Sequence, residues 1–218
     1  MRNPGGAVRC AAMSTPPEAI QWKLNDTLRR VISHVRTTQA DPASLAEAEA
    51  ALAKVEALLA PHAHPGPYQQ SGLDVTAGEP PEWGDDPGSF FPYSPVIGAL
   101  NPIAPPLTFR VEGGEVTGEG TLGAPYNGPP TAVHGGVVAM VLDELLGCVA
   151  VVNERGGFTG TLTVRYLAPT PVGAPLRMHA SVARTEGRKT WAQGGIWCGE
   201  TKTAEAEGIF IQSAALPA

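Results

Sequence analysis

Apolar residues recur every three or four positions in two stretches near the amino terminus, the spacing of helices that bury one stripe of side chains. Asp41 and Pro42 separate the stretches and suit the N-cap and the first position of the second helix. We expect a helical hairpin within an extension over residues 1–60, packed on its own domain or a partner subunit, or forming a lid over a substrate channel. The apolar positions are Leu24, Leu28, Val31 and Val35, then Leu45, Ala48, Leu52, Val55 and Leu59.

The pattern disappears in residues 61–105, because this region is rich in proline; residues 61–106 hold 11 of the chain's 22 prolines. Proline cannot continue a helix or a central strand, so we expect a connector that lies over the surface. His62 and His64 alternate within it without further ligands at metal-binding spacing. They are interpreted as solvated loop histidines, and no metal site is expected.

From residue 106 to 218 the pattern becomes strand, turn, strand, long helix and four further strands, which predicts an α+β domain. Leu107, Phe109 and Val111 alternate with polar residues before Gly113 and Gly114, the signal of a two-residue hairpin turn. After the helix we expect strands over residues 160–167, 176–183, 191–198 and 207–214, with 184–189 and 199–204 as connections. These elements predict an antiparallel sheet with one central helix.

The long helix contains two acids, Asp143 and Glu144, which are its only charges between Val137 and Val152. Its other side chains are apolar on all faces, so the sheet would cover one side and a second subunit the other. A carboxylate is costly to ionise there and requires an explanation. With about 16 residues and two acids, the helix is expected to be too short and too charged to span a bilayer of roughly 30 Å.

His134, Gly135 and Gly136 open this helix. Glycines there allow a substrate to approach the backbone, and free N–H groups at the positive end of the helix dipole stabilise an oxygen that gains negative charge. Gly135 and Asp143 are separated by about 12 Å of helix at 1.5 Å per residue, so one helix cannot bring both to one carbonyl group. If both act together, the site lies between two subunits.

Composition excludes several other classes. The 218 residues carry a net charge of −6 without a basic cluster, which argues against nucleic acid as a partner. Cys10, Cys148 and Cys198 form no disulfide framework, and no targeting signal is recognised, so a cytoplasmic location is expected, with translation starting at Met1 or Met13. The G-x-G-x-x-G match at 118–123 is not followed by a helix, and neither a P-loop nor a serine-hydrolase elbow is present.

The segments "YNGPPTAVHGGVVAMVLDELLG", "FTGTLTVRYLAPTPVGAPL" and "EGRK" resemble hotdog-fold acyl-coenzyme A (acyl-CoA) thioesterases of the PaaI type, over about residues 106–215. The resemblance implies an antiparallel sheet wrapped around a central helix and a homodimer or dimer of dimers. It also implies hydrolysis of an acyl-CoA thioester. Coenzyme A is then part of the substrate, and no separate cofactor or membrane is required.

The resemblance also implies roles for individual residues. The Gly135 N–H would bind the thioester oxygen, while His134 would shape the turn. Asp143 would be the nucleophile or the general base, and the Thr159 hydroxyl would help to place the attacking water across the interface.

Coenzyme A itself would meet the groups at Asn127 and Gly136 and the basic turn at Arg188 and Lys189. Glu144, rotated about 100° from Asp143 around the helix, is expected to face elsewhere as a structural or interfacial acid.

Two alternatives share this fold. A hydratase or dehydratase would carry a histidine soon after the acid, but none follows Asp143 before His179. A non-catalytic acyl-CoA sensor would keep the pocket and lose the acid, whereas Asp143 is present.

Overall fold

The structure is a computed structural model and describes residues 16–66, 68–71 and 85–212. The predicted hairpin is present, with α1 at Pro16–Thr37 and α2 at Pro42–Leu59, followed by the short 3₁₀ helix η1 at Ala60–His62. Asp41 caps α2, as predicted: its Oδ1 accepts hydrogen bonds from the N–H of Ala43 (2.9 Å) and of Ser44 (3.0 Å). Met13 and Cys10 lie outside the described residues.

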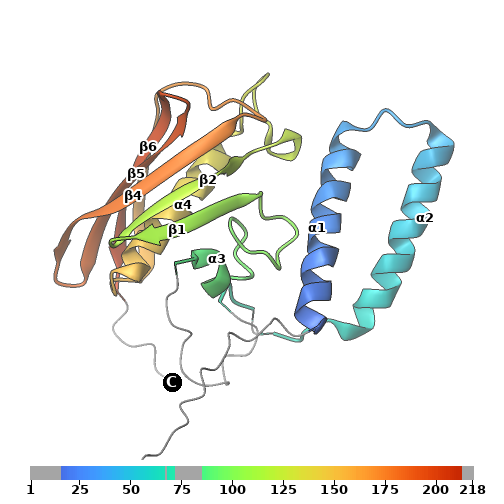
Figure 1. The fold of residues 1–218 in the computed structure, drawn as a ribbon, viewed down its shortest axis with the longest axis horizontal. Coiled ribbons are helices and arrows are strands. Elements are labelled where there is room, and N and C mark those ends of the chain that lie inside the picture. Colours follow the sequence, from blue (N-terminus) through green and yellow to red (C-terminus); the bar gives the residue numbers. More distant parts are fainter. Residues whose placement is uncertain (1–15, 67, 72–84, 213–218) are drawn as a thin grey trace, which may run out of the picture.

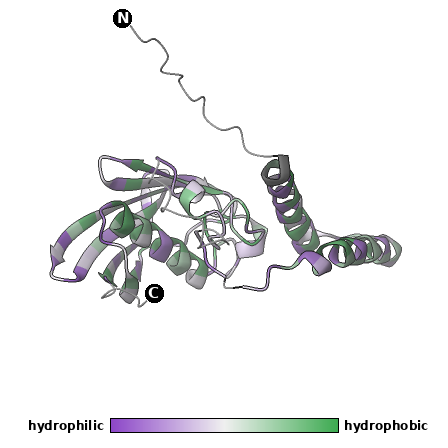
Figure 2. Cartoon of the chain, turned by 90° about the horizontal axis from the view of Figure 1, so that it is seen from below, coloured by the Kyte–Doolittle hydropathy of each residue, from purple (hydrophilic) through white to green (hydrophobic). Residues whose placement is uncertain are grey.

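The hairpin stands beside the sheet (Figure 1), and α1 contacts the connector that precedes β1. The guanidinium of Arg29 donates to four backbone carbonyls, those of Gly98, Ala99, Asn101 and Ala104, over 2.7–3.1 Å. Burial lowers the pKa of Arg29 from its ordinary value. In contrast, α2 has no buried residue, and apolar side chains lie along both helices (Figure 2). The prediction that α2 buries its apolar stripe is therefore wrong within a single chain.

The proline-rich connector enters the core. Its described part contains the short helix α3 at Pro87–Phe90, after which Phe91, Val96 and Ile97 are buried in the same apolar cluster as the sheet and the long helix. The prediction that the connector lies on the surface is wrong for this part. Proline prevents regular strand pairing, but turns satisfy the backbone hydrogen-bonding groups of this segment. In one of them the Gly98 N–H donates to the Ser94 carbonyl at 3.0 Å. Apolar side chains can therefore point inward.

Six strands form one antiparallel sheet in the order β1-β2-β4-β5-β6-β3. The 3₁₀ helix η2 at Ala124–Tyr126 follows the first two strands. The hairpin turn is confirmed, since Gly113 and Gly114 have positive φ angles of 59° and 83°. The strands are β1 Leu107–Glu112, β2 Glu115–Thr121, β3 Phe158–Tyr166, β4 Pro175–Glu186, β5 Lys189–Cys198 and β6 Thr201–Ile211.

The last strand differs from its prediction. It begins at Thr201, inside the segment 199–204 that was expected to be a connection, and it ends at Ile211. Thr203 is buried there, and its hydroxyl accepts a hydrogen bond from the hydroxyl of Thr170 at 3.0 Å. A threonine with a buried partner can occupy an inward strand position, which its polarity alone did not suggest.

The long helix α4, Gly135–Val152, lies against the inner face of the sheet (Figure 1). Leu142, Leu145 and Leu146 are fully buried between them. With 18 residues it is longer than predicted, and among the described helices it is the one long and apolar enough to cross a membrane. The core helix of a soluble protein passes the same test, so this length and composition are weak support for a span. The α+β hotdog architecture is confirmed.

The strand β3 forms one edge of the sheet and pairs only with β6 among the described strands. Three large apolar side chains are exposed on or just beyond this strand: Phe158 (66%), Tyr166 (56%) and Leu167 (52%). The edge thus combines free backbone hydrogen-bonding groups with apolar surface, a combination that favours pairing with another strand.

Candidate active site

The first turn of α4 leaves one backbone donor free. His134 is the N-cap: its Nδ1 accepts from the Gly136 N–H at 3.0 Å, and its carbonyl accepts from the N–H groups of Val137 (2.9 Å) and Val138 (3.1 Å). No hydrogen bond among the described residues uses the Gly135 N–H. This N–H therefore combines a free donor with the positive end of the helix dipole.

Gly136 is explained by the cap. A Cβ at this position would lie 3.2 Å from both Cε1 and Nδ1 of the His134 ring, so glycine allows the ring to fold over the helix end. Because Nδ1 accepts the bond, His134 carries its proton on Nε2 when neutral. The Gly136 N–H is thus engaged by His134, and the contact of Gly136 with coenzyme A stays a prediction.

Two neighbouring groups fix the position of Gly135. The hydroxyl of Tyr166, the last residue of β3, donates to the Gly135 carbonyl at 2.9 Å. Asn127 Nδ2 donates to the carbonyls of Pro129 and Ala132, both at 2.9 Å, and so closes the loop that leads into the helix. The amide hydrogens of Asn127 hold this loop, and its contact with the ligand stays a prediction. Tyr166 was not predicted, since an aromatic residue at a strand end gives no specific signal.

Asp143 meets Thr159 at the other end of β3, where the threonine hydroxyl donates to Asp143 Oδ1 at 3.1 Å. A β-bulge makes this contact possible, because Gly160 has no partner between the pairs Thr159–Phe210 and Thr161–Ile209. Regular alternation would point Thr159 to the same outer face as Thr161, and the extra residue turns it toward α4. A Cβ at Gly160 would lie 2.7 Å from the Ile211 side chain, so a larger residue there would displace that side chain.

A cavity of about 120 Å³ lies beside this pair, and Asp143, Glu144 and Thr159 all line it. The prediction that Glu144 faces elsewhere is wrong. Asp143 and Glu144 point about 100° apart around the helix axis, and the cavity lies between them, so both side chains reach it. Ser94 donates its hydroxyl to Glu144 Oε1 at 2.6 Å. Burial raises the pKa of Glu144; the Ser94 hydrogen bond opposes this effect and the nearby Asp143 adds to it.

Arg188 and Lys189 lie in and beside the β4–β5 turn and are exposed. Lys189 pairs with Ile211 of β6, and Ile211 pairs with Phe158 of β3. The turn therefore lies two strands away from the end of β3 that carries Thr159, roughly 10 Å at the usual spacing. Arg188 makes a long contact of 3.5 Å with the Gln212 carbonyl, and neither side chain forms an ion pair within the described residues.

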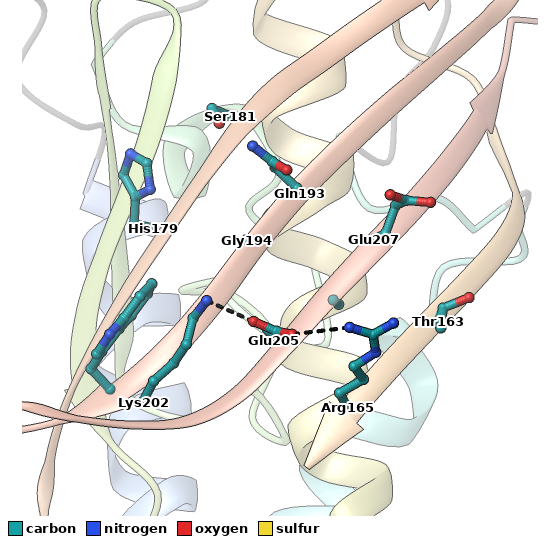
Figure 3. Close-up of a pocket in the computed structure, with 11 residues that line it drawn as sticks. Thr163, Arg165, His179, Ser181, Gln193, Gly194, Lys202, Glu205 and Glu207 are labelled. Atoms are coloured by element: carbon teal, nitrogen blue, oxygen red, sulfur yellow. Dashed lines mark hydrogen bonds and ion pairs between the residues drawn. The ribbon is translucent and has the colours of Figure 1, made fainter. Parts of the chain in front are cut away.

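A larger hollow of about 460 Å³ lies on the outer face of the sheet, opposite α4 (Figure 3). Three of its charged side chains pair with one another: Glu205 accepts from Lys202 at 2.8 Å and forms an ion pair with Arg165 at 3.6 Å. None of the predicted site residues lines it. The described residues also contain no group of three or more His, Cys, Asp or Glu side chains arranged to hold a metal.

Comparison with known proteins supports the fold. Residues 131–205, from the loop before α4 into β6, match the Thioesterase superfamily model. Over these residues the chain is similar to members of the thioesterase superfamily. The crystal structure of a thioesterase superfamily protein superposes on 97% of the chain and 94% of its own length with a TM-score of 0.73 at 27% identity. The thioesterase superfamily likeness expected from the sequence is thus confirmed. Because the superposition covers 97% of the chain, it also includes the hairpin region.

Sequence relatives match about two fifths of the chain. Acyl-coenzyme A thioesterase THEM4 of Xenopus laevis is 35% identical over 91 residues, which is 40% of this chain and 41% of that protein. Acyl-coenzyme A thioesterase THEM5 of Homo sapiens is 28% identical over 92 residues, which is 41% of this chain and 37% of that protein. The chain thus aligns with less than half the length of these relatives.

Proposed function

We propose that this protein hydrolyses an acyl-CoA thioester to a free acid and coenzyme A. One observation carries the proposal: a free N–H at Gly135 and the Asp143–Thr159 pair lie at opposite ends of the same open edge strand. A donor for an oxyanion and a carboxylate that can act as base or nucleophile are the two parts required for attack on a thioester. Names of the THEM4 and THEM5 relatives support the substrate class.

The two parts would meet across a dimer. An antiparallel pairing of two β3 strands centred on Leu162 would set Phe158 opposite Tyr166 of the partner subunit and cover the exposed apolar edge. Thr159 and Asp143 would then approach Gly135 of the partner subunit, because Tyr166 is bonded to Gly135. Each dimer would contain two sites, each with its acid from one subunit and its oxyanion donor from the other.

In such a site the Gly135 N–H would bind the thioester oxygen, and Asp143 would attack the carbonyl carbon or remove a proton from water. Loss of bulk water at the interface strengthens the hydrogen bond to the oxyanion. The Thr159 hydroxyl orients Asp143 through its bond to Oδ1. Arg188 and Lys189 would meet the phosphates of coenzyme A, since the turn lies near the Thr159 end of β3.

The test is release of coenzyme A thiol across a panel of acyl-CoA esters, comparing wild type with Asp143→Asn. We expect kcat to fall by several orders of magnitude, with the fold and acyl-CoA binding retained. Near wild-type activity in Asp143→Asn contradicts the assignment of Asp143. Binding without thiol release in the wild-type protein supports a non-catalytic sensor, and hydration of an enoyl thioester without thiol release supports a hydratase.

A further inference from the structure

Glu144 follows Asp143 on α4 and lines the same cavity, but the proposed reaction gives it no role. Its remaining neighbours there are largely apolar and include Phe91, Cys148 and Phe210. No ion pair to Glu144 occurs within the described residues. A carboxylate without a cationic partner in such surroundings costs stability, which is typical of groups retained for function.

The position of one Glu144 oxygen is fixed by Ser94, which is fully buried. Ser94 Oγ accepts hydrogen bonds from the N–H groups of Val96 (3.0 Å) and Ile97 (3.2 Å). Both acceptor positions of the hydroxyl are thereby used, and its single proton is directed to Glu144 Oε1. Glu144 Oε1 is therefore held as an acceptor, and the side chain cannot rotate without breaking this bond.

Ser94 leaves the second oxygen, Oε2, unused. Oε2 accepts no hydrogen bond from any described residue. In the described part of the chain, however, every fully buried side-chain nitrogen or oxygen has a hydrogen-bond partner. Oε2 must therefore retain accessible surface, and the cavity that Glu144 shares with Asp143 and Thr159 supplies it. At about 120 Å³ this cavity has room for several water molecules.

We propose that Glu144 holds the water that attacks the thioester, together with Asp143. This inference rests on the proposed function and assigns Asp143 the role of general base. The water donates one hydrogen to Asp143 and the other to Glu144 Oε2, which leaves an oxygen lone pair free to attack the carbonyl carbon. The oxygen–carbon bond forms and the carbon–sulfur bond breaks. Asp143 takes the first proton and passes it to the sulfur of the departing coenzyme A thiolate.

The test variant is Glu144→Gln, which has nearly the same shape as the natural residue. Its amide oxygen can accept the Ser94 hydroxyl, so the amide NH₂ would occupy the cavity and replace an acceptor with a donor. We expect kcat to fall about 10- to 100-fold, less than the roughly 100- to 10,000-fold typical of groups that transfer the proton, because Glu144 only positions the water. KM should stay within about twofold, and Tm should not fall.

Glu154→Gln is the matched control, because Glu154 lies just beyond the C-terminal end of α4, is exposed and does not line the cavity. It should leave kcat, KM and Tm unchanged. A Glu144→Gln kcat within about twofold of wild type overturns the proposal, and so does a kcat that falls together with Tm, which indicates a structural role.

Asp143→Asn, measured in the same series, separates this inference from the proposed function. If Asp143→Asn is inactive while Glu144→Gln matches wild type, the water-holding role fails and the thioesterase proposal stands. If wild type releases no thiol from any acyl-CoA, or Asp143→Asn remains fully active, the proposed chemistry fails and the role of Glu144 fails with it.

Discussion

Asp143 and Glu144 are consecutive carboxylates with different surroundings. Asp143 accepts from the exposed hydroxyl of Thr159, whereas Glu144 accepts from a fully buried serine in a largely apolar wall. Burial raises the pKa of Glu144, and the titratable groups that interact with it are Asp143 and Cys148 on the same helix. The pair therefore separates two tasks: one side chain is open to exchange protons, and the other is held in place.

The raised pKa of Glu144 predicts how stability depends on pH. Above the ordinary value of 4.5, the folded protein binds the Glu144 proton more tightly than the unfolded chain does. Its contribution to the free energy of unfolding is therefore fully present below that value and is lost as pH rises through the folded pKa. Urea unfolding at several pH values should find Glu144→Gln gaining stability relative to wild type as pH rises. A relative gain as pH falls would contradict the burial argument.

Individual residues differ in how far the sequence reveals them. The free N–H at Gly135 follows from a glycine at a helix start, so it could be predicted. The bond between Ser94 and Glu144 joins residues 50 positions apart, within a proline-rich stretch that has no periodic pattern. Thr159 was assigned to the site only by resemblance. Its alternation with Thr161 and Thr163 suggests the outer face, and the bulge at Gly160 that reverses this is invisible in the hydrophobic pattern.

At the scale of elements, strong local signals located the helices and most strands. Asp41 before Pro42 and the Gly113–Gly114 turn carry specific backbone requirements, so their elements were found. The start of β6 was missed because Thr203 owes its buried position to a hydroxyl partner from another loop. The connector was misjudged because proline content reports on backbone pairing and says little about where neighbouring apolar side chains point.

The β4–β5 turn supports a prediction about coenzyme A. Replacing both basic side chains, Arg188→Ala with Lys189→Ala, should raise KM for acyl-CoA and weaken its salt dependence while kcat changes little, because phosphate contacts act in binding. Steady-state kinetics at several salt concentrations measures both effects. An acyl N-acetylcysteamine thioester lacks the nucleotide and should be hydrolysed equally well by both proteins. Equal impairment on the two substrates would exclude this turn as the phosphate site.

At the scale of the whole molecule, the proposed site requires two copies of the chain, and this can be tested by complementation. Gly135→Pro removes the N–H while proline remains compatible with the first helical position and with the extended ψ of 132° at His134. Subunits with Asp143→Ala and subunits with Gly135→Pro should each be inactive. Mixing equal amounts should restore about a quarter of wild-type activity, because half of the dimers carry one intact site. A fully active monomer in light scattering, or a mixture as inactive as its components, would refute the shared site.

The attachment of the hairpin through Arg29 has a consequence for how the molecule opens. Because α2 buries no side chain and no residue of the hairpin belongs to the apolar core around α4, we expect the hairpin to detach without disturbing that core once the bonds of Arg29 break. Its amide hydrogens should exchange with deuterium through this partial opening, at a lower free energy than those of α4 and β5, which exchange only on global unfolding. The chain thus behaves as two cooperative units of unequal stability.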